Sequence, residues 1–299
     1  MNYASHSDLD ALIGGPVPLA RHLTVIAEVG INHNGDLDLA KRLIRLAKQC
    51  GCDAVKFQKR SIDTVYTPEF LDSPRESPWG TTQREQKEGL EFGRAEYDVI
   101  DRTCRENGIE WSASAWDLES LDFVQSYDPP FHKIASAMLT HEPFITAVAA
   151  DQKLTYISTG MSRYRDIDRA VEVFRKADCP FVLMHCVAEY PAPVAHLNMQ
   201  MVHSLAERYR CPVGYSGHEV SITPSLMAAM LGAVAIERHV TLDRAMYGSD
   251  QAASLERRGL ELLVQYLRTI PEAWGDGEKR VLPGEQEAAD KLRYWAEAS

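Results

Sequence analysis

The sequence predicts a closed α/β barrel of eight strands and eight helices, and three observations support this fold class. Short apolar segments rich in β-branched residues alternate with longer segments of helical periodicity, which is typical of a parallel sheet covered by helices. The chain has 299 residues, which suits one barrel domain of about 250 residues. A doubly wound open sheet is the rival fold, but no Gly-x-Gly-x-x-Gly turn follows the first predicted strand.

The first strand and helix set the pattern for the rest. Residues 24–30 (TVIAEVG) are apolar except for Glu28, as expected of a strand buried on both faces. An amphipathic helix is predicted over 38–50, and Gly51 ends it. Because parallel strands are joined by right-handed crossovers, the repeated unit closes most simply as a (β/α)₈ TIM barrel. Further strands are predicted at 54–58, 109–112, 132–135, 154–158, 181–185, 212–218 and 233–239, and further helices at 95–106, 118–127, 143–150, 166–176, 224–231 and 255–270.

Segments outside this alternation define the domain organisation. Residues 1–22 are polar and broken by glycine and proline, so we expect an N-terminal surface leader. The TIM-barrel catalytic domain is predicted over 23–275, and a C-terminal linker with a short tail helix over 276–299. Residues 61–91 form a polar insertion after the second strand.

Composition excludes some classes of partner. The formal net charge of −11 argues against a nucleic acid or an anionic membrane surface, although a local cluster of cations can still bind a small anion. The six cysteines include no Cys-x-x-Cys pair and mostly lie in apolar contexts, which favours reduced thiols. No stretch has the length or polarity of a membrane span or a signal peptide. A cytoplasmic protein is therefore predicted.

Polar side chains at the ends of the predicted strands are the candidate functional residues. The carboxyl ends of barrel strands share one rim, where such barrels place their chemistry. Burying charged groups there costs several kcal/mol unless they are paired or bind something, so a shared site is favoured over scattered ion pairs. The set comprises Glu28, Lys56, Gln58, Ser114, Lys133, Ser136, Ser158, Thr159, His185, Ser216, His218, Glu237 and His239.

Two histidines, His218 and His239, end the last two predicted strands. Their imidazoles could bind one divalent metal ion, which Asp250 could reach through water. On spacing alone, two unrelated histidines are an equal alternative. Lysines with serines suit a phosphate and a carboxylate, and a metal would polarise a carbonyl group. The residue types thus favour a small phosphorylated carboxylate and a carbonyl compound as substrates.

Several motifs occur in register along the predicted barrel. They are 26–36 (IAEVGINHNGD), 55–58 (VKFQ), 157–162 (ISTGMS), 214–218 (GYSGH) and 236–239 (IERH) followed by 241–243 (TLD). Together they resemble the sialic acid synthase family over about residues 25–256. The resemblance implies condensation of phosphoenolpyruvate with an N-acylhexosamine-like aldose to give a 2-keto-3-deoxy sugar acid and phosphate. It also implies a divalent metal cofactor, Mn²⁺ or Mg²⁺, and a homodimer.

The resemblance also implies roles for individual residues. His218 and His239 would bind the metal, and Glu28 and Asp250 match acidic positions near the attacking water. We expect one of these two carboxylates to manage the proton of that water. Tyr190 matches a residue that lines the sugar pocket. The positions expected to bind substrate, chiefly phosphoenolpyruvate, are Lys56, Gln58, Ser114, Lys133, Ser136, Ser158 and Ser216.

Departures from the family pattern concern the acceptor sugar. Met138 stands where many members have a glutamate that contacts the amino sugar, and the loop from Asp250 to Ser254 lacks the usual histidine. Bacterial members add an antifreeze-like domain, for which residues 276–299 are too few. Either the acceptor needs no such clamp, or another segment closes the mouth; the candidates are the segment 67–91 and the tail helix with Trp295. The alternatives are a related phosphoenolpyruvate-using enzyme with a different aldehyde acceptor, and a non-catalytic sugar-binding barrel.

Overall fold

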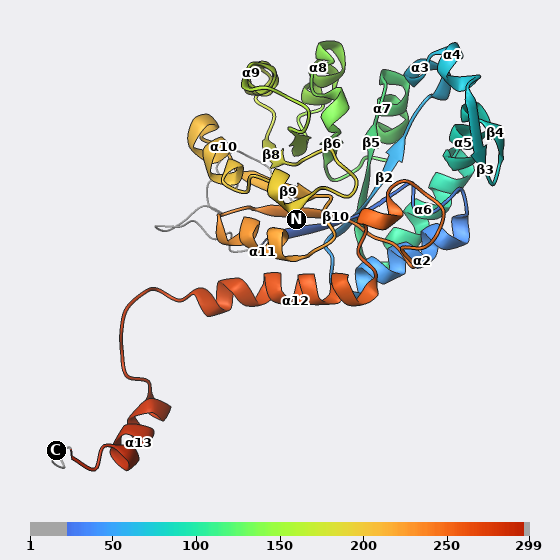
Figure 1. Cartoon of the computed structure of the whole chain (residues 1–299). Coiled ribbons are helices and arrows are strands. Elements are labelled where there is room, and N and C mark those ends of the chain that lie inside the picture. Colours follow the sequence, from blue (N-terminus) through green and yellow to red (C-terminus); the bar gives the residue numbers. More distant parts are fainter. Residues whose placement is uncertain (1–22, 296–299) are drawn as a thin grey trace.

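Residues 23–295 are described by the computed structural model, so the predicted leader lies outside the described residues. Eight parallel strands form one sheet that curves into a nearly closed barrel surrounded by helices (Figure 1). The predicted fold class is confirmed. The strands are β1 (Thr24–Gly30), β2 (Ala54–Lys59), β5 (Glu110–Ala115), β6 (His132–Ile134), β7 (Thr155–Ser158), β8 (Phe181–His185), β9 (Val213–Gly217) and β10 (Ala235–His239).

The barrel strands follow one another in chain order. Strand β10 pairs with β1, with Glu28 and His239 in register, so the last strand closes on the first. Within residues 23–295, β5 and β6 are the edge strands of the sheet, and no ladder joins them. Ser112 Oγ on β5 donates to the Phe131 carbonyl oxygen, 2.7 Å away and just before β6. We call this join, bridged by a side chain, the β5–β6 seam.

Eight main helices lie outside the sheet. In α2, the Asp36 side chain accepts from the backbone N–H groups of Asp38 and Leu39, which fixes where the helix begins. No bounds were predicted for α10, because a long irregular stretch with Pro191 and Pro193 precedes it and obscures the periodicity. The main helices are α2 (Leu37–Gln49), α6 (Arg94–Asn107), α7 (Leu118–Gln125), α8 (Glu142–Ala150), α9 (Tyr164–Lys176), α10 (Met201–Tyr209), α11 (Thr223–Met230) and α12 (Arg257–Trp274).

The hydrophobic core is formed by the strands and the helix faces that pack on them. Ile26 and Val55 of neighbouring strands and Ile44 of α2 have no exposed surface. All six cysteines are unpaired and buried, as the sequence predicts. No helix in the described part of the chain is long and apolar enough to cross a membrane.

The polar insertion after β2 has secondary structure of its own. A Cβ on Gly89 would lie 2.2 Å from the Trp79 ring, so this glycine lets the indole pack on its helix. The Trp79 ring also contacts Tyr247, with centroids 5.7 Å apart, which attaches the insertion to the loop that carries Asp250. Its elements are α3 (Ile62–Val65), α4 (Pro68–Leu71), the hairpin strands β3 (Pro74–Ser77) and β4 (Gly80–Thr82), and α5 (Gln83–Leu90).

The C-terminal segment leaves the barrel after α12. An extended stretch leads to helix α13 (Pro283–Leu292), which stands away from the barrel in Figure 1. Trp295 is 70% exposed. The expected closure of the mouth by the tail helix is therefore wrong for this conformation.

Candidate active site

A cavity of about 230 Å³ lies at the carboxyl ends of the strands. Eleven of the twelve predicted site residues line it, all except Asp250. Parallel strands bring them together from β1, β2, β5, β6, β7, β9 and β10 and from the loops that follow β6 and β8. The eleven are Glu28, Lys56, Gln58, Ser114, Lys133, Ser136, Ser158, Tyr190, Ser216, His218 and His239.

Two buried lysines, Lys56 and Lys133, and two buried glutamates, Glu28 and Glu237, form the floor of this cavity. Lys56 Nζ lies 2.8 Å from Glu28 Oε2 and donates to Ser114 Oγ at 2.9 Å. Lys133 Nζ donates to Ser158 Oγ at 2.6 Å. Each of these four charged side chains is no more than 5% exposed, so the floor holds equal numbers of cationic and anionic groups out of water. A carboxylate or phosphate entering the cavity would find both ammonium groups and their serine hydroxyls within one small space.

Glu237 links the two lysines. Its Oε1 accepts from Ser216 Oγ at 3.1 Å and lies 3.9 Å from Lys56 Nζ and 3.8 Å from Lys133 Nζ. Burial is the largest influence on the pKa of Lys56 and lowers it, but Glu237 and Glu28 outweigh burial, so this pKa is raised. Burial lowers the pKa of Lys133, and repulsion from Lys56 adds to the effect. The two lysines therefore differ, because only Lys56 has a second carboxylate in contact.

The two imidazoles lie side by side at the cavity wall, with ring centroids 5.5 Å apart. His218 Nδ1 lies 2.8 Å from the Val187 carbonyl oxygen, so Nδ1 carries the proton and Nε2 keeps its lone pair. Burial lowers the pKa of His218 to about 3, which keeps the ring neutral. The buried His239 Nδ1 has no hydrogen-bond partner among the described residues.

The two rings suit a divalent metal, because imidazole nitrogen is among its usual protein ligands and His218 leaves its Nε2 lone pair available. Among residues 23–295 no group of three or more His, Cys, Asp or Glu side chains could hold a metal ion. The pair would thus supply part of a coordination shell, and water or substrate oxygen atoms would supply the remainder.

Asp250 lies at the edge of the cavity and does not line it. Its Oδ2 is 3.7 Å from His239 Nδ1, and its Oδ1 accepts from Ser249 Oγ at 2.7 Å. Glu28, in contrast, faces the cavity directly. The geometry favours Glu28 over Asp250 for contact with a small molecule bound there.

The open side of the cavity is formed by Tyr190, whose ring lies 4.2 Å from that of His218 between centroids. Tyr190 is 46% exposed, so a ligand could reach it from solvent. Ser136, which follows β6, also lines the cavity, and its Oγ lies 3.2 Å from Cys186 Sγ.

Six residues that line the cavity were missing from the predicted site; besides three alanines, they are Trp116, Met161 and Glu237. Glu237 was noted only as a polar strand end, and Trp116 and Met161 were not singled out. Trp116 directly follows β5, and Met161 adopts a left-handed backbone conformation with φ 57° and is 72% exposed. An aromatic residue at the end of a strand is the signal that could have identified Trp116.

Other strand-end polar residues have structural roles. Thr159 Oγ1 donates to the Met184 carbonyl oxygen at 3.0 Å, and His185 Nε2 lies 2.7 Å from the Leu197 carbonyl oxygen. Neither lines the cavity. Met138 packs against the hydrophobic core, so its thioether does not face the acceptor space directly.

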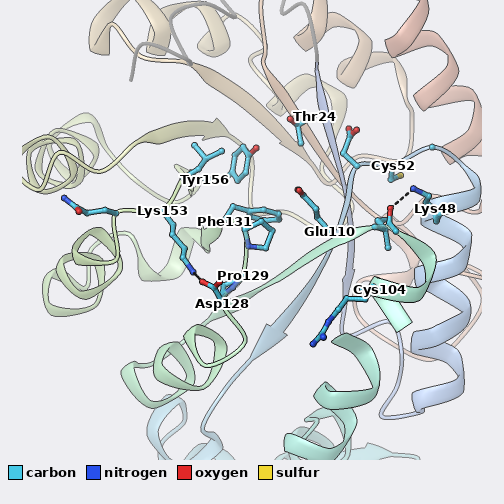
Figure 2. Close-up of a pocket in the computed structure, with 18 residues that line it drawn as sticks. Thr24, Lys48, Cys52, Cys104, Glu110, Asp128, Pro129, Phe131, Lys153 and Tyr156 are labelled. Carbon is cyan, nitrogen blue, oxygen red and sulfur yellow. Dashed lines mark hydrogen bonds and ion pairs between the residues drawn. The ribbon is translucent and has the colours of Figure 1, made fainter. Parts of the chain in front are cut away.

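A larger cavity, of about 1010 Å³, lies at the opposite ends of the strands (Figure 2). It is lined by residues that begin strands, such as Thr24 and Glu110, and no histidine lies among its described lining residues. Figure 2 shows Lys153 directed to Asp128 and Lys48 directed to a backbone carbonyl oxygen, that of Gly108. These contacts link neighbouring surface segments. Because this end of a barrel commonly serves stability, the smaller cavity is the candidate active site.

Comparison with known proteins identifies related sequences. A family model described as the NeuB family matches residues 43–279. The human N-acetylneuraminate-9-phosphate synthase is 36% identical over 271 residues, which cover 90% of this chain and 76% of that protein. The N,N'-diacetyllegionaminic acid synthase of Legionella pneumophila is 34% identical over 278 residues, which cover 90% of this chain and 78% of that protein.

Similarity extends to solved structures. The sialic acid synthetase of Leptospira borgpetersenii, crystallised with citrate, superposes with a TM-score of 0.79 at 28% identity. The match covers 94% of this chain and 96% of that one. The barrel and the order of its elements are therefore shared along nearly the whole of both chains.

Proposed function

The chain belongs to the NeuB family, and on that premise we propose that it condenses phosphoenolpyruvate with a sugar aldehyde to give a 2-keto-3-deoxy sugar acid and phosphate. The relatives that it matches are named as sugar acid synthases, which supports condensation as the reaction class. The observation that carries the proposal is the convergence of two ammonium groups and two imidazoles on one cavity of about 230 Å³.

Phosphoenolpyruvate is the proposed donor because its two anionic groups suit the cationic floor. Lys56 and Lys133 would hold its carboxylate and phosphate, with the hydroxyls of Ser114, Ser158 and Ser216 completing the contacts. Ser136 and Gln58 would border the same ligand. Fixing both ends would leave C3, the nucleophilic carbon, directed to the aldehyde.

The proposed reaction forms a carbon–carbon bond between C3 and the aldehyde carbon, and it replaces the bond from C2 to the phosphate oxygen by a bond to the oxygen of water. C3 of the enol phosphate attacks the aldehyde carbon, whose oxygen takes up a proton, and positive charge develops at C2. Water then adds at C2 and loses one proton. Phosphate leaves with cleavage of its bond to C2, and the new hydroxyl group loses its remaining proton to give the keto group. We assign the proton of that water to Glu28, which lines the cavity, with Asp250 as the alternative at its edge.

A divalent metal, Mn²⁺ or Mg²⁺, is proposed at His218 and His239. When bound, it would polarise the aldehyde carbonyl and stabilise the developing alkoxide. The chain's own contribution is to hold both rings buried at the cavity wall, with His218 kept neutral by burial and fixed by its contact with Val187.

The proposed acceptor is an N-acylhexosamine-like aldose, bound beside Tyr190. Related family members have products named N-acetylneuraminate-9-phosphate and N,N'-diacetyllegionaminic acid, so the acceptor varies among relatives. A different aldehyde is the alternative, since Trp116 and Met161 shape the open part of this cavity. A non-catalytic sugar-binding barrel is disfavoured by the balanced, buried charges of the floor, which cost free energy to retain.

The decisive experiment follows phosphate release from phosphoenolpyruvate labelled with ¹⁸O in its bridging oxygen, across a panel of aldoses with Mn²⁺ or Mg²⁺. Condensation with C–O cleavage places the label in phosphate. Label left in the keto acid would indicate hydrolysis at phosphorus and would contradict the proposal, as would absence of release with every sugar. Lys133→Met, which removes one cation from the floor, is expected to abolish release.

We also propose a cytoplasmic homodimer. The six unpaired, buried cysteines support a reducing compartment. Sedimentation equilibrium would test the oligomeric state, because the monomer mass is 33.5 kDa.

A further inference from the structure

Arg60, which directly follows β2, contacts three groups around the cavity although it does not line it. Its Nη1 lies 3.5 Å from Glu91 Oε1, and its Nη2 donates to Gln58 Oε1. Its guanidinium carbon lies 4.3 Å from the centre of the Trp116 ring. The Arg60 side chain is only 11% exposed, so these contacts hold a cation that is largely out of water.

The contact with Arg60 fixes which way the Gln58 amide points. A guanidinium has only donors, so the amide must present its carbonyl oxygen to Arg60. The amide nitrogen then faces Glu28, where Nε2 donates to Oε1 at 2.8 Å. The other oxygen of Glu28 faces the Lys56 ammonium at 2.8 Å, which is also only a donor. Both oxygens of Glu28 therefore lie next to donors, one from Gln58 and one from Lys56.

We propose that Arg60 is a positioning residue: it orients the Gln58 amide and thereby holds the Glu28 side chain directed into the cavity. The proposal rests on the proposed function, in which Glu28 takes the proton of the attacking water. Arg60 is in turn held by Glu91 at the end of the insertion helix α5. The insertion thus serves the active site, because its Glu91 fixes Arg60, which in turn orients the Gln58 amide.

Without Arg60, the Gln58 amide would be free to turn over. A turned amide would place its carbonyl oxygen beside the Glu28 carboxyl group, and the donor from Gln58 would be lost. Glu28 would then keep only its contact with Lys56, and its side chain would no longer be fixed in the cavity. In variants that lack the guanidinium, kcat is therefore expected to fall.

The other charged groups near Glu28 and Arg60 stay in place in variants that lack the Arg60 guanidinium. Glu28 is faced by Lys56 from β2 and by the paired position His239 from β10, and Lys56 also contacts Glu237. Around Arg60 the ionisable neighbours are Lys59, Glu91, Lys87, Tyr66 and the buried His33.

The test compares Arg60→Met, Arg60→Lys and a matched control, Arg94→Met. Arg94 also lies over an aromatic ring, with its guanidinium carbon 4.3 Å from the centre of Phe123, but it is remote from the cavity. For Arg60→Met we expect kcat to fall by about tenfold to a hundredfold, because the reacting groups are misplaced, with little change in KM for phosphoenolpyruvate. Arg60→Lys keeps the charge but not the planar set of guanidinium donors, so it restores only part of the rate. Arg94→Met should behave as the wild type does.

A crystal structure of Arg60→Met gives a readout that does not depend on activity. Loss of the contact between Gln58 Nε2 and Glu28 Oε1, together with the lower kcat at a retained KM, supports the proposal. A wild-type kcat, or a retained contact in the variant, overturns it. If the wild type releases no phosphate with any sugar, the proposed function fails, while the two crystal structures still decide whether Arg60 orients Gln58.

Discussion

Lys133 Nζ lies 3.8 Å from Glu237 Oε1, inside a barrel that holds both side chains away from water. The same carboxylate oxygen lies 3.9 Å from Lys56. One anion thus faces two cations, and only Lys56 has a second carboxylate, that of Glu28, within contact distance. An anionic ligand is therefore expected to stabilise the charged form of Lys133 more than that of Lys56.

Glu237→Gln is expected to destabilise the fold by about 3 kcal/mol, because it leaves a buried ammonium without its carboxylate. Urea unfolding measures the loss. Glu207, on the exposed face of α10, provides the control, and Glu207→Gln should change stability by less than about 0.5 kcal/mol. Inorganic phosphate should restore part of the stability of the Glu237 variant, since it supplies the missing negative charge. A variant as stable as the wild type would contradict this account of the floor.

His33 is expected to make stability depend on pH. Burial lowers the pKa of His33 to about 3, and its Nδ1 accepts from the Gly35 N–H at 3.1 Å. The unfolded chain binds this proton near pH 6.5, while the folded protein resists it down to about 3. The stability from neutral His33 is therefore fully present above pH 6.5 and is lost as the pH falls towards 3.

For His33→Asn, which keeps an acceptor for Gly35, the slope of the unfolding free energy against pH between pH 4 and 6 should fall by about 1.4 kcal/mol per pH unit. Urea unfolding at several pH values gives the slope. His203→Asn, at a side chain that is 57% exposed, should leave the slope unchanged. Equal slopes for the His33 variant and the wild type would show that His33 does not resist protonation in the fold.

Trp116 has a buried indole N–H for which the described part of the chain offers no hydrogen-bond partner. Because Trp116 lines the cavity, we expect a bound sugar to accept this hydrogen bond. Trp116→Phe keeps a ring beneath Arg60 and removes only the donor, so KM for the sugar should rise by about fivefold while kcat is retained. Steady-state kinetics with phosphoenolpyruvate held saturating measure this effect. Trp274→Phe, on exposed α12, is the control, and an unchanged KM for every accepted sugar would exclude the role.

Removal of divalent metal should abolish phosphate release, because only the metal can polarise the aldehyde in the proposed reaction. Activity after treatment with a chelator is expected to return with Mn²⁺ or Mg²⁺. His218→Ala and His239→Ala should each lower metal affinity by about a hundredfold or more, as measured by calorimetry. Wild-type activity that persists after exhaustive chelation would contradict a role for the metal.

The barrel and most of the site could be predicted from the sequence because parallel strands leave few geometric alternatives. A strand such as β1 (Thr24–Gly30) is recognisable by its apolar composition, and every strand end lies on the same rim. Glu28 and His239 could be assigned to one cavity without knowing any distance.

Side-chain direction and loop structure could not be predicted in the same way. Thr159 and His185 end strands as His218 does, yet they bond backbone carbonyls outside the cavity. The orientation of Trp116 depends on Arg60, a contact between two strand ends that no periodicity encodes. Asp250 lies at the edge because its loop is held by the insertion, through Trp79 and Tyr247.

The β5–β6 seam has a consequence for how the protein loses activity. Backbone amides on its two edges lack the ladder that protects the other joins, so hydrogen exchange should be fastest there among the barrel strands. Ser114 and Lys133 lie on opposite sides of this join, and each would contact the donor in the proposed reaction. Separation of β5 from β6 would therefore disrupt the binding site for the donor, while the ladders between the other neighbouring strands stay intact. Mild denaturant should accordingly inactivate the protein before the barrel as a whole unfolds.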